Sequence, residues 1–452
     1  MEVKNVKGTK DIFGKEASRY QKVETLMKGI SSLFNFEEMR PPMMEHSEVF
    51  VRGVGEGSDI VRKEMYTFLD KGGRSLTLRP EFTAGIMRTI VQNKLYATQD
   101  LPIKVFYCGP AFRYERPQLG RYRQFIQFGV EMVGVSSIFH QVEVISLGYT
   151  ILKSLGFENL TLKVNTLGDD ESREAYKKAL KDYFKDHIEN MCPDCKSRFE
   201  INPLRILDCK VPEDQLIVKD APKMSDYLSD AAKERFEKLL SYLDMCEIQY
   251  EVDDTLVRGL DYYSETVFEF HYLSKKNNNY GAIGAGGHYD KLVHELGGPS
   301  IAGIGFSLGV DRVVSALTDD GIFDTEAEED RLVACVLPVG EDAQPFAQLA
   351  ASALRVSGYA TDIIYDNVKL GSLIKKAVKK HAKYAIIIGQ TEIDTQSVLV
   401  KDLDSGEQYN VGFDDIISFF DEQLQSCHCD DEECHCHDGE CCCGHHHNGG
   451  DN

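Results

Sequence analysis

The sequence predicts an α+β domain with an antiparallel sheet, interrupted by a helical insertion and followed by a smaller α/β domain and a disordered tail. Three observations lead to this fold class. Short strand and helix patterns mix irregularly up to about residue 320, strands and helices alternate regularly from residue 332, and the last residues have no apolar pattern. Irregular mixing is typical of antiparallel α+β folds, whereas regular alternation is typical of parallel α/β units.

The first domain, expected over residues 1–325, opens with helical spacing of apolar residues at 18–34, where Ser18 is the expected N-cap. Pro41 and Pro42 follow and exclude a helix at that point. Further helices are expected at residues 81–93 and 140–155. Strands are expected at residues 65–68, 75–78, 104–108, 124–133 and 160–165.

Residues 170–250 differ in composition from the segments before and after them. They are charged and helix-rich, and they contain Cys192-Pro193-Asp194-Cys195. Strand and glycine-rich character returns at residues 256–272 and 281–309. The stretch is therefore expected to be an insertion into the first domain.

The second domain is expected over residues 330–425. Strand patterns at 332–338, 360–366 and 384–388 alternate with helical patterns at 343–357 and 372–382, which predicts a small α/β domain with a largely parallel sheet. Residues 426–452 are of low complexity and are expected to be disordered.

The chain is strongly acidic, with 51 Lys and Arg against 73 Asp and Glu and a formal net charge of −22. This argues against a passive nucleic-acid coat, which needs bulk positive charge, but does not exclude a protein with local basic patches. No apolar run approaches a membrane span, and the N-terminus lacks a signal-peptide pattern, so a cytoplasmic location without a membrane partner is expected. The scattered cysteines before the tail favour reduced thiols.

The segment 112–131 is basic and aromatic. It carries Arg113, Arg116, Arg121 and Arg123 among aromatic residues, and then alternates like a strand up to Glu131. The planar fork of arginine binds phosphate oxygens bidentately, and aromatic faces stack on bases. The segment therefore indicates a phosphate and nucleotide site.

Three further segments complete a pattern. Residues 78–84 place an acid and a hydroxyl at the start of a helix, residues 256–263 read Leu-Val-Arg-Gly-Leu-Asp-Tyr-Tyr, and residues 303–312 are glycine-rich and end in an arginine. Together with 112–131, and in this order, they closely resemble class II aminoacyl-tRNA synthetases, specifically the histidyl-tRNA synthetase family, over residues 1 to about 425. The segment 112–131 resembles motif 2 of the class, 303–312 resembles motif 3, and the neighbourhood of Pro42 resembles motif 1. Residues 256–263 and 285–290 resemble the two histidine-specific signatures.

The resemblance implies a histidine–tRNA ligase. Such an enzyme joins the carboxylate of L-histidine to the α-phosphate of ATP, with Mg²⁺, and then transfers histidine to the 3′ end of histidine tRNA. Fixed cations near the α-phosphate would stabilise the developing charge. The implied catalytic residues are Arg113, Arg258 and Gln127, with Arg258 in the place that a metal ion holds in other class II enzymes. The implied ATP-binding residues are Arg113, Glu115, Arg121, Phe125 and Arg312, the adenine lying between Phe125 and Arg312.

Histidine recognition needs acceptors for an ammonium and an imidazole. The resemblance implies Glu81, Thr83, Gln127, Glu131, Arg258, Tyr262, Tyr263 and Tyr289 for this task. Gln127 and Glu131 are four residues apart, so they lie on one face of a strand, with Gly129 between them. A glutamine and an acid there indicate the polar floor of a pocket. One departure is His288, where the family usually has an arginine.

Transfer to tRNA is implied to involve the loop after Glu115. Arg116, Gln118 and Arg123 match positions near the acceptor end of the tRNA. The second domain resembles the anticodon-binding domain of the family, and motif 1 implies a homodimer.

Three alternatives stay open. The first is a catalytically inactive, synthetase-like regulatory subunit of histidine biosynthesis, which would be expected to lack the second domain and much of the two histidine signatures. The second is a synthetase for another amino acid, against which Arg258 and the polar pocket argue. The third is a metal-handling protein with a synthetase fold, suggested by the tail.

Two groups of cysteines suggest metal binding. Cys192 and Cys195, with Cys209 fourteen residues on, suggest a zinc knuckle whose fourth ligand is open, with Cys246 and His187 as candidates and free thiols as the alternative. The tail holds seven cysteines and six histidines, a composition that suits zinc, nickel or copper. Its candidate ligands are Cys427, Cys429, Cys434, Cys436, Cys441, Cys442, Cys443, His445, His446 and His447.

Overall fold

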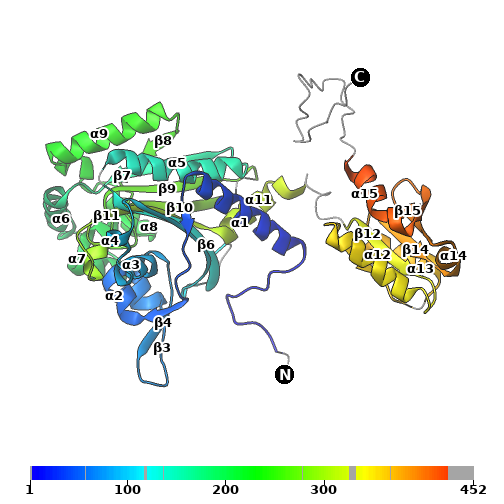
Figure 1. The fold of residues 1–452 in the computed structure, drawn as a ribbon. Coiled ribbons are helices and arrows are strands. Elements are labelled where there is room, and N and C mark those ends of the chain that lie inside the picture. The colour runs from blue at the N-terminus through cyan, green and yellow to red at the C-terminus, as the bar shows by residue number, and fades with distance from the viewer. Residues whose placement is uncertain are drawn as a thin grey trace, which may run out of the picture. The chain divides into compact units, whose positions relative to one another are not determined.

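The structure, a computed structural model, describes residues 3–55, 57–116, 120–135, 137–276, 278–324, 332–366 and 368–425. The chain divides into two compact units, Met1–Thr325 and Glu326–Asn452 (Figure 1). The predicted metal-binding tail and Gln118 lie outside the described residues. Among the residues described, no helix is long and apolar enough to cross a membrane.

The first unit is built on an eight-stranded sheet in the order β1-β5-β6-β11-β10-β9-β7-β8. The six central strands pair antiparallel, and only the edge strands β1 and β8 pair parallel with their neighbours. The predicted antiparallel α+β fold is thus confirmed. The strands are β1 (Glu37–Glu38), β5 (Ile103–Phe112), β6 (Gln124–Val135), β7 (Leu160–Thr166), β8 (Tyr250–Val252), β9 (Ser264–Leu273), β10 (Asn279–Tyr289) and β11 (Ala302–Gly309).

Helices cover one face of this sheet with a large apolar core. The helices that contribute to it are α1 (Lys15–Leu33), α5 (Ile138–Ser154), α9 (Asp230–Met245) and α11 (Val310–Asp319). Alternate strand residues such as Phe128, Val130 and Met132 point into this core. The intervening residues of the same strands are left for the opposite face, where a pocket lies.

The opposite face is closed by shorter elements. They are α2 (Ser47–Val54), η1 (Ile60–Glu64), α3 (Thr83–Gln92), α4 (Leu95–Thr98), α10 (Leu292–Glu295) and a three-stranded sheet of β2 (Met44–His46), β3 (Tyr66–Leu69) and β4 (Ser75–Leu78). Helix α1 begins at Lys15 with Gly14 as N-cap, so the expected N-cap at Ser18 is wrong. The amide of Ser18 already donates to the carbonyl of Gly14 at 3.2 Å, which places Ser18 inside the first turn.

The insertion forms its own small core but does not stand apart. It comprises α6 (Asp170–Phe184), η2 (Ile188–Asn190), α7 (Pro193–Ile201), η3 (Pro203–Asp208), α8 (Pro212–Val218) and η4 (Met224–Tyr227), and it leads into α9. Tyr176, Phe184 and Ile206 are buried in its core. Helix α9 packs on α5 instead, where Tyr242 stacks on Phe139 with 4.3 Å between ring centroids.

The second unit has a mixed five-stranded sheet in the order β13-β12-β14-β15-β16. Three strands, β12 (Ala334–Pro338), β13 (Thr361–Ile363) and β14 (Tyr384–Ile388), are parallel as expected. A hairpin of β15 (Ser397–Asp402) and β16 (Gln408–Gly412), absent from the predicted elements, adds two antiparallel strands. Its turn is fixed by Asp402, whose carboxylate accepts the amides of Asp404 and Ser405, and by Gly406 at φ 80°. The helical elements are α12 (Gln344–Val356), α13 (Leu370–Lys379), α14 (Gln390–Thr395), η6 (Phe413–Asp415) and α15 (Ile416–Gln425).

Candidate active site

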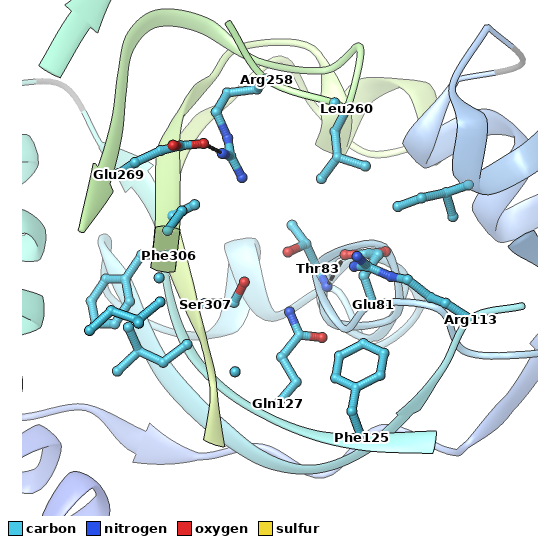
Figure 2. A pocket seen from close by; sticks show the side chains of 18 of the residues that line it. Glu81, Thr83, Arg113, Phe125, Gln127, Arg258, Leu260, Glu269, Phe306 and Ser307 are labelled. Carbon is cyan, nitrogen blue, oxygen red and sulfur yellow. Dashed lines mark hydrogen bonds and ion pairs between the residues drawn. The ribbon is translucent and has the colours of Figure 1, made fainter. Parts of the chain in front are cut away.

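A pocket of about 380 Å³ opens on the face of the large sheet that the helical core leaves free (Figure 2). Its floor comes from β6 and β11, and its walls come from the start of α3, the loop before β9 and strand β10. The structure brings together in this pocket every residue predicted for histidine or ATP: Glu81, Thr83, Arg113, Glu115, Arg121, Phe125, Gln127, Glu131, Arg258, Tyr262, Tyr263, Tyr289 and Arg312.

Glu81 lies at the start of helix α3 and caps it. One carboxylate oxygen accepts the backbone amide of Thr83 at 2.6 Å, and the other accepts that of Ala84 at 2.9 Å. Burial raises the pKa of the Glu81 carboxyl, although these hydrogen bonds oppose the shift. Glu81, which lines the pocket, is therefore held in place by its hydrogen bonds to the start of helix α3.

Glu131 lies deeper, in the middle of β6, and is only 2% exposed. One carboxylate oxygen accepts the hydroxyl of Thr83 at 2.6 Å, and the other accepts that of Tyr289 at 2.8 Å. Burial raises its pKa to about 8. On the neighbouring strand, a Cβ at Gly305 would lie 2.1 Å from this carboxylate, so only glycine fits beside it.

Tyrosine rings form one wall around this acid. The ring centroids of Tyr262 and Tyr263 are 4.5 Å apart, and those of Tyr262 and Tyr289 are 5.8 Å apart. Tyr107, which the sequence analysis does not single out, reaches Glu131 from β5 with its hydroxyl at 3.5 Å. A Cβ at Gly129 would lie 2.3 Å from that hydroxyl. The gap between Gln127 and Glu131 on their strand is thus filled by a cross-strand tyrosine.

Positive charge gathers at the other end of the pocket. Arg113 donates from Nε to the carbonyl of Pro80 at 2.8 Å, and its guanidinium carbon lies 5.3 Å from the centre of the Phe125 ring. Glu115 lies 3.9 Å from both Arg113 and Arg121, too far for strong pairing. Burial lowers the pKa of Arg312, and Arg121 lowers it further. Cations that repel one another in a pocket are suited to a polyanion.

Arg312 is positioned by the residue beside it. Asp311, in the first turn of α11, accepts the amide of Ile126 on β6 and the hydroxyl of Tyr20 on α1, both at 2.7 Å. Arg312 itself donates to the carbonyl of Ala282 at 2.5 Å. This buried connection fixes Arg312 relative to the strand that carries Phe125.

Arg258 reaches the pocket from the loop before β9. Its guanidinium pairs with Glu269 of that strand and lies 5.7 Å from the ring centre of Tyr263, and its buried Nε has no partner among the described residues. Glu269 is absent from the predicted site. The signal for it was present in the sequence, since Glu269 is a single acid between Phe268 and Phe270 in a run that reads as a strand.

Gln127 lies on the floor between the two ends of the pocket (Figure 2). It is 6% exposed, and its side-chain carbonyl has no hydrogen-bond partner within the described part of the chain. A buried acceptor without a partner is costly, and such groups concentrate where a ligand binds.

Two of the residues predicted to touch tRNA, Arg116 and Arg123, are described by the structure and do not line the pocket. Arg123 packs on Tyr114, with its guanidinium carbon 3.9 Å from the ring centre, and donates to the carbonyl of Glu115 at 3.2 Å. Arg116 is exposed. With Gln118 outside the described residues, the predicted acceptor contacts stay a prediction.

A second hollow of about 200 Å³ adjoins the pocket. It is lined by polar residues of α6 and α10 such as Asp170 and Lys177. The residues that line both cavities are Arg205, Arg258, Leu260, Tyr262 and Tyr263.

His288, the departure noted in the sequence, is buried on β10. Its Nδ1 lies 3.3 Å from the hydroxyl of Ser264 and 3.5 Å from Asp290. Burial lowers the pKa of its imidazole.

Comparisons with known proteins agree with this geometry. The chain matches the family described as Histidyl-tRNA synthetase over residues 8–313 and the Anticodon binding domain over residues 333–423. It is 43% identical to the histidine–tRNA ligase of Lysinibacillus sphaericus, over 94% of this chain and 100% of that protein. The identity is 45% to the histidine–tRNA ligase of Lactiplantibacillus plantarum, over 92% and 98%. The apo histidyl-tRNA synthetase of S. aureus superposes with a TM-score of 0.79 at 34% identity, over 93% of this chain and 100% of that one.

The antiparallel sheet and its pocket thus define a class II aminoacyl-tRNA synthetase fold, followed by an anticodon-binding domain. The chain belongs to the histidyl-tRNA synthetase family.

Proposed function

We propose that this chain is a histidine–tRNA ligase, which activates L-histidine with ATP and transfers it to histidine tRNA. The observation that carries the proposal is a single pocket with a buried polar end, built of Glu81, Thr83 and Glu131, and a cationic end, built of Arg113 and Arg312. The first end suits an amino acid with a polar side chain, and the second suits a triphosphate.

For histidine, we assign the ammonium to Glu81 and Thr83, and the imidazole to Glu131, Tyr263 and Tyr289. Glu131 supports this role because its pKa of about 8 lets it hold or release a proton near neutral pH. We assign Gln127 to both charged groups on the α-carbon of histidine. Its side-chain carbonyl accepts from the ammonium, and its side-chain amide donates to the carboxylate. An apolar amino acid would bring no hydrogen-bonding group to this buried polar end of the pocket.

In the activation step, a carboxylate oxygen of histidine attacks the α-phosphorus of ATP. The bond from that phosphorus to the bridging oxygen breaks, and pyrophosphate leaves with the electron pair. Arg113 and Arg258 stabilise the charge on the α-phosphoryl oxygens from two sides. Glu269 holds the guanidinium of Arg258 in place, and neither arginine gives up its proton.

For ATP, we assign adenine to the space between Phe125 and Arg312, with Glu115 as the acid on the adenine side, and the phosphates to Arg113 and Arg121. Magnesium neutralises phosphate charge when it is bound with ATP. Glu64, another carboxylate that lines the pocket, would be its protein ligand; burial raises the pKa of Glu64, and the proximity of Glu115 raises it further.

The tRNA half of the reaction rests on the loop after Glu115 and on the second unit. We assign Arg116, Gln118 and Arg123 to the acceptor end, and the second unit to the anticodon. A homodimer fits the exposed apolar residues Leu33, Met43 and Met44 in the part of the chain that resembles motif 1. The substrates tRNA and ATP favour a cytoplasmic enzyme.

The test is histidine-dependent exchange of labelled pyrophosphate into ATP. We expect exchange with histidine and none with proline or threonine. Exchange with another amino acid but not histidine would contradict the proposal, and so would an absence of exchange in a folded, ATP-binding chain.

A further inference from the structure

Three cysteines and an aspartate meet inside the insertion. Cys192 precedes α7, Cys195 lies in its first turn, Cys209 follows η3, and Asp214 lies in the first turn of α8. One ligand atom from each lies within 4.8 Å of all the others. Cys195, Cys209 and Asp214 are buried.

The donor atoms have separations suited to one small ion. The sulfurs of Cys192 and Cys209 are 3.9 Å apart, and a carboxylate oxygen of Asp214 lies 3.2 Å from the sulfur of Cys209. Tetrahedral zinc, with bonds of about 2.3 Å to sulfur and about 2.0 Å to oxygen, places two sulfurs about 3.8 Å apart and a sulfur and an oxygen about 3.5 Å apart. A disulfide would need about 2.05 Å.

The backbone supports charged donors at this place. The amide of Cys195 donates to the sulfur of Cys192 at 3.4 Å, a hydrogen bond that stabilises a thiolate. Asp214 is 2% exposed and has no Lys or Arg within ion-pair distance in the described ranges. Its carboxylate accepts the backbone amide of Cys192 at 3.1 Å, and a divalent cation would balance its charge, which these neutral donors do not.

The fourth ligand is thus not one of the two candidates considered from the sequence. Cys246 is exposed at the end of α9, and the ring of His187 packs against Tyr183 with 5.1 Å between centroids. Asp214, in the first turn of α8, is the fourth residue whose donor atom lies close to those of the three cysteines.

We propose that Cys192, Cys195, Cys209 and Asp214 bind one zinc ion in a closed structural site. Three soft thiolates and one carboxylate select zinc over calcium or magnesium, which prefer oxygen ligands. No open coordination position is left for chemistry, so the ion acts as a clamp between α7, η3 and α8.

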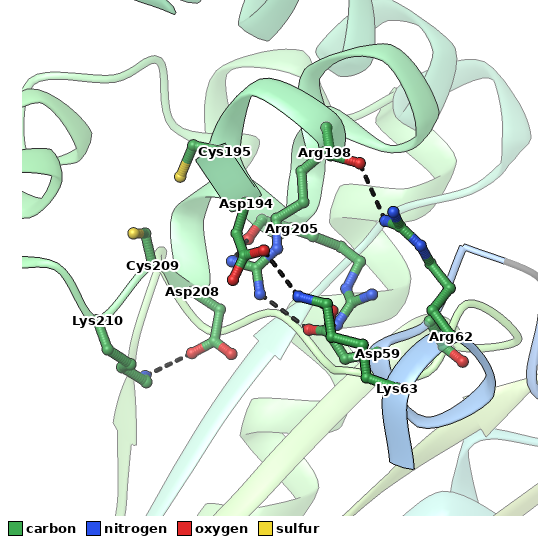
Figure 3. A network of polar contacts seen from close by, with 12 residues as sticks. Asp59, Arg62, Lys63, Asp194, Cys195, Arg198, Arg205, Asp208, Cys209 and Lys210 are labelled. Carbon is green, nitrogen blue, oxygen red and sulfur yellow. Dashed lines mark hydrogen bonds and ion pairs between the residues drawn. The ribbon is translucent and has the colours of Figure 1, made fainter. Parts of the chain in front are cut away.

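The clamped elements contact the wall of the active-site pocket (Figure 3). Arg198 of α7 and Arg205 of η3 both donate to Asp59 at 2.9 Å, and Lys63 pairs with Asp194 at 2.7 Å. Asp59 and Arg205 line the pocket. The zinc would therefore fix the positions of Arg198 and Arg205 relative to Asp59, which lines one side of the pocket.

The test measures zinc in the full chain, purified with reductant, by elemental analysis. We compare the wild type with Cys209→Ser and with Cys246→Ser, a matched control that removes an exposed cysteine of the same helical region. Because the tail is identical in all three, its metal cancels in the difference. We expect Cys209→Ser to hold one zinc fewer per chain and Cys246→Ser to hold as many as the wild type. Equal zinc in all three would overturn the proposal.

A second measurement needs no variant and locates the ion. The native chain is alkylated with and without a chelator, and peptide mass spectrometry reports each cysteine separately. We expect chelation to raise labelling of Cys192, Cys195 and Cys209 at least tenfold, with Cys246 labelled equally in both. Labelling that responds to reductant but not to chelator would show a disulfide and overturn the zinc site. Labelling of these three that responds to neither would overturn it as well.

Discussion

The two sheets of this chain use their faces differently. In the second unit, β12 and β14 are buried along their whole length, with Val336 and Ile386 in one apolar cluster and Leu337 and Ile387 in another. In the first unit, one face of β6 is apolar, whereas the other carries Gln127 and Glu131. The first sheet therefore presents polar side chains to a pocket on its own face, whereas the two central strands of the second sheet are apolar on both faces.

This difference has an energetic side. Burying Glu81 and Glu131 costs free energy, which the hydrogen bonds from Thr83, Ala84 and Tyr289 offset only in part. The second sheet carries no such cost in its two buried strands. Substitutions in the first sheet should therefore change activity and pH dependence, whereas matched ones in the second should not.

The largest effect is expected from Arg258→Ala. It removes a fixed cation from the proposed α-phosphate site and leaves His271 as the remaining partner of Glu269, so we expect pyrophosphate exchange to fall about 10³-fold. Arg355→Ala, which removes a hydrogen bond to the carbonyl of Thr361 in the second unit, should leave exchange unchanged. Near-full exchange by Arg258→Ala would reduce Arg258 to a structural ion-pair partner.

Removal of the second unit is expected to separate the two half-reactions. A chain ending at residue 325 keeps the whole pocket, so exchange should stay within about tenfold of the intact chain. Charging of histidine tRNA should fall about 100-fold or more, because one of two linked binding modules is lost. Equal losses of exchange and charging would mean that the second unit also supports the pocket.

Glu131→Gln should change how stability depends on pH. The folded Glu131 has a pKa of about 8 against an ordinary 4.5, so between these values the folded state keeps a proton that the unfolded state releases. Its contribution to the free energy of unfolding is thus present below pH 4.5 and is lost as pH rises to about 8.

Urea unfolding across this range measures that loss. We expect the free energy of unfolding of Glu131→Gln to fall by about 1–3 kcal/mol less than that of the wild type over this pH range. Glu341→Gln, an exposed glutamate in the second unit, should leave it unchanged. If the stability of Glu131→Gln declined with pH as steeply as that of the wild type, Glu131 would be ionised in the folded chain across this range.

The smallest effect is expected from Phe125→Ala. Loss of one aromatic face from the proposed adenine site should raise the KM for ATP about tenfold and leave the KM for histidine nearly unchanged. Phe125→Tyr keeps the ring and should behave like the wild type. A rise in the histidine KM alone would place Phe125 in the wall of the amino-acid site.

The sequence predicts the helices and strands better than it predicts which side chains contact one another. Strands such as β4 and β14 are found at their expected bounds because alternation and length define them locally. Glu269 and Asp214 are not found, because their roles depend on residues that only the fold brings near them. The chain has 73 Asp and Glu residues, and the sequence alone does not indicate which of them lies beside an arginine or beside three thiols.

The wall shared by the two hollows has a consequence for inhibitor design. Arg258, Tyr262 and Tyr263 separate the substrate pocket from a second, polar hollow that reaches Asp170 and Lys177. A compound confined to the pocket lies among the groups that we assign to histidine and ATP. A compound extended past this wall would also meet insertion side chains outside the proposed chemistry, and its selectivity could be tuned there without weakening its grip on the pocket.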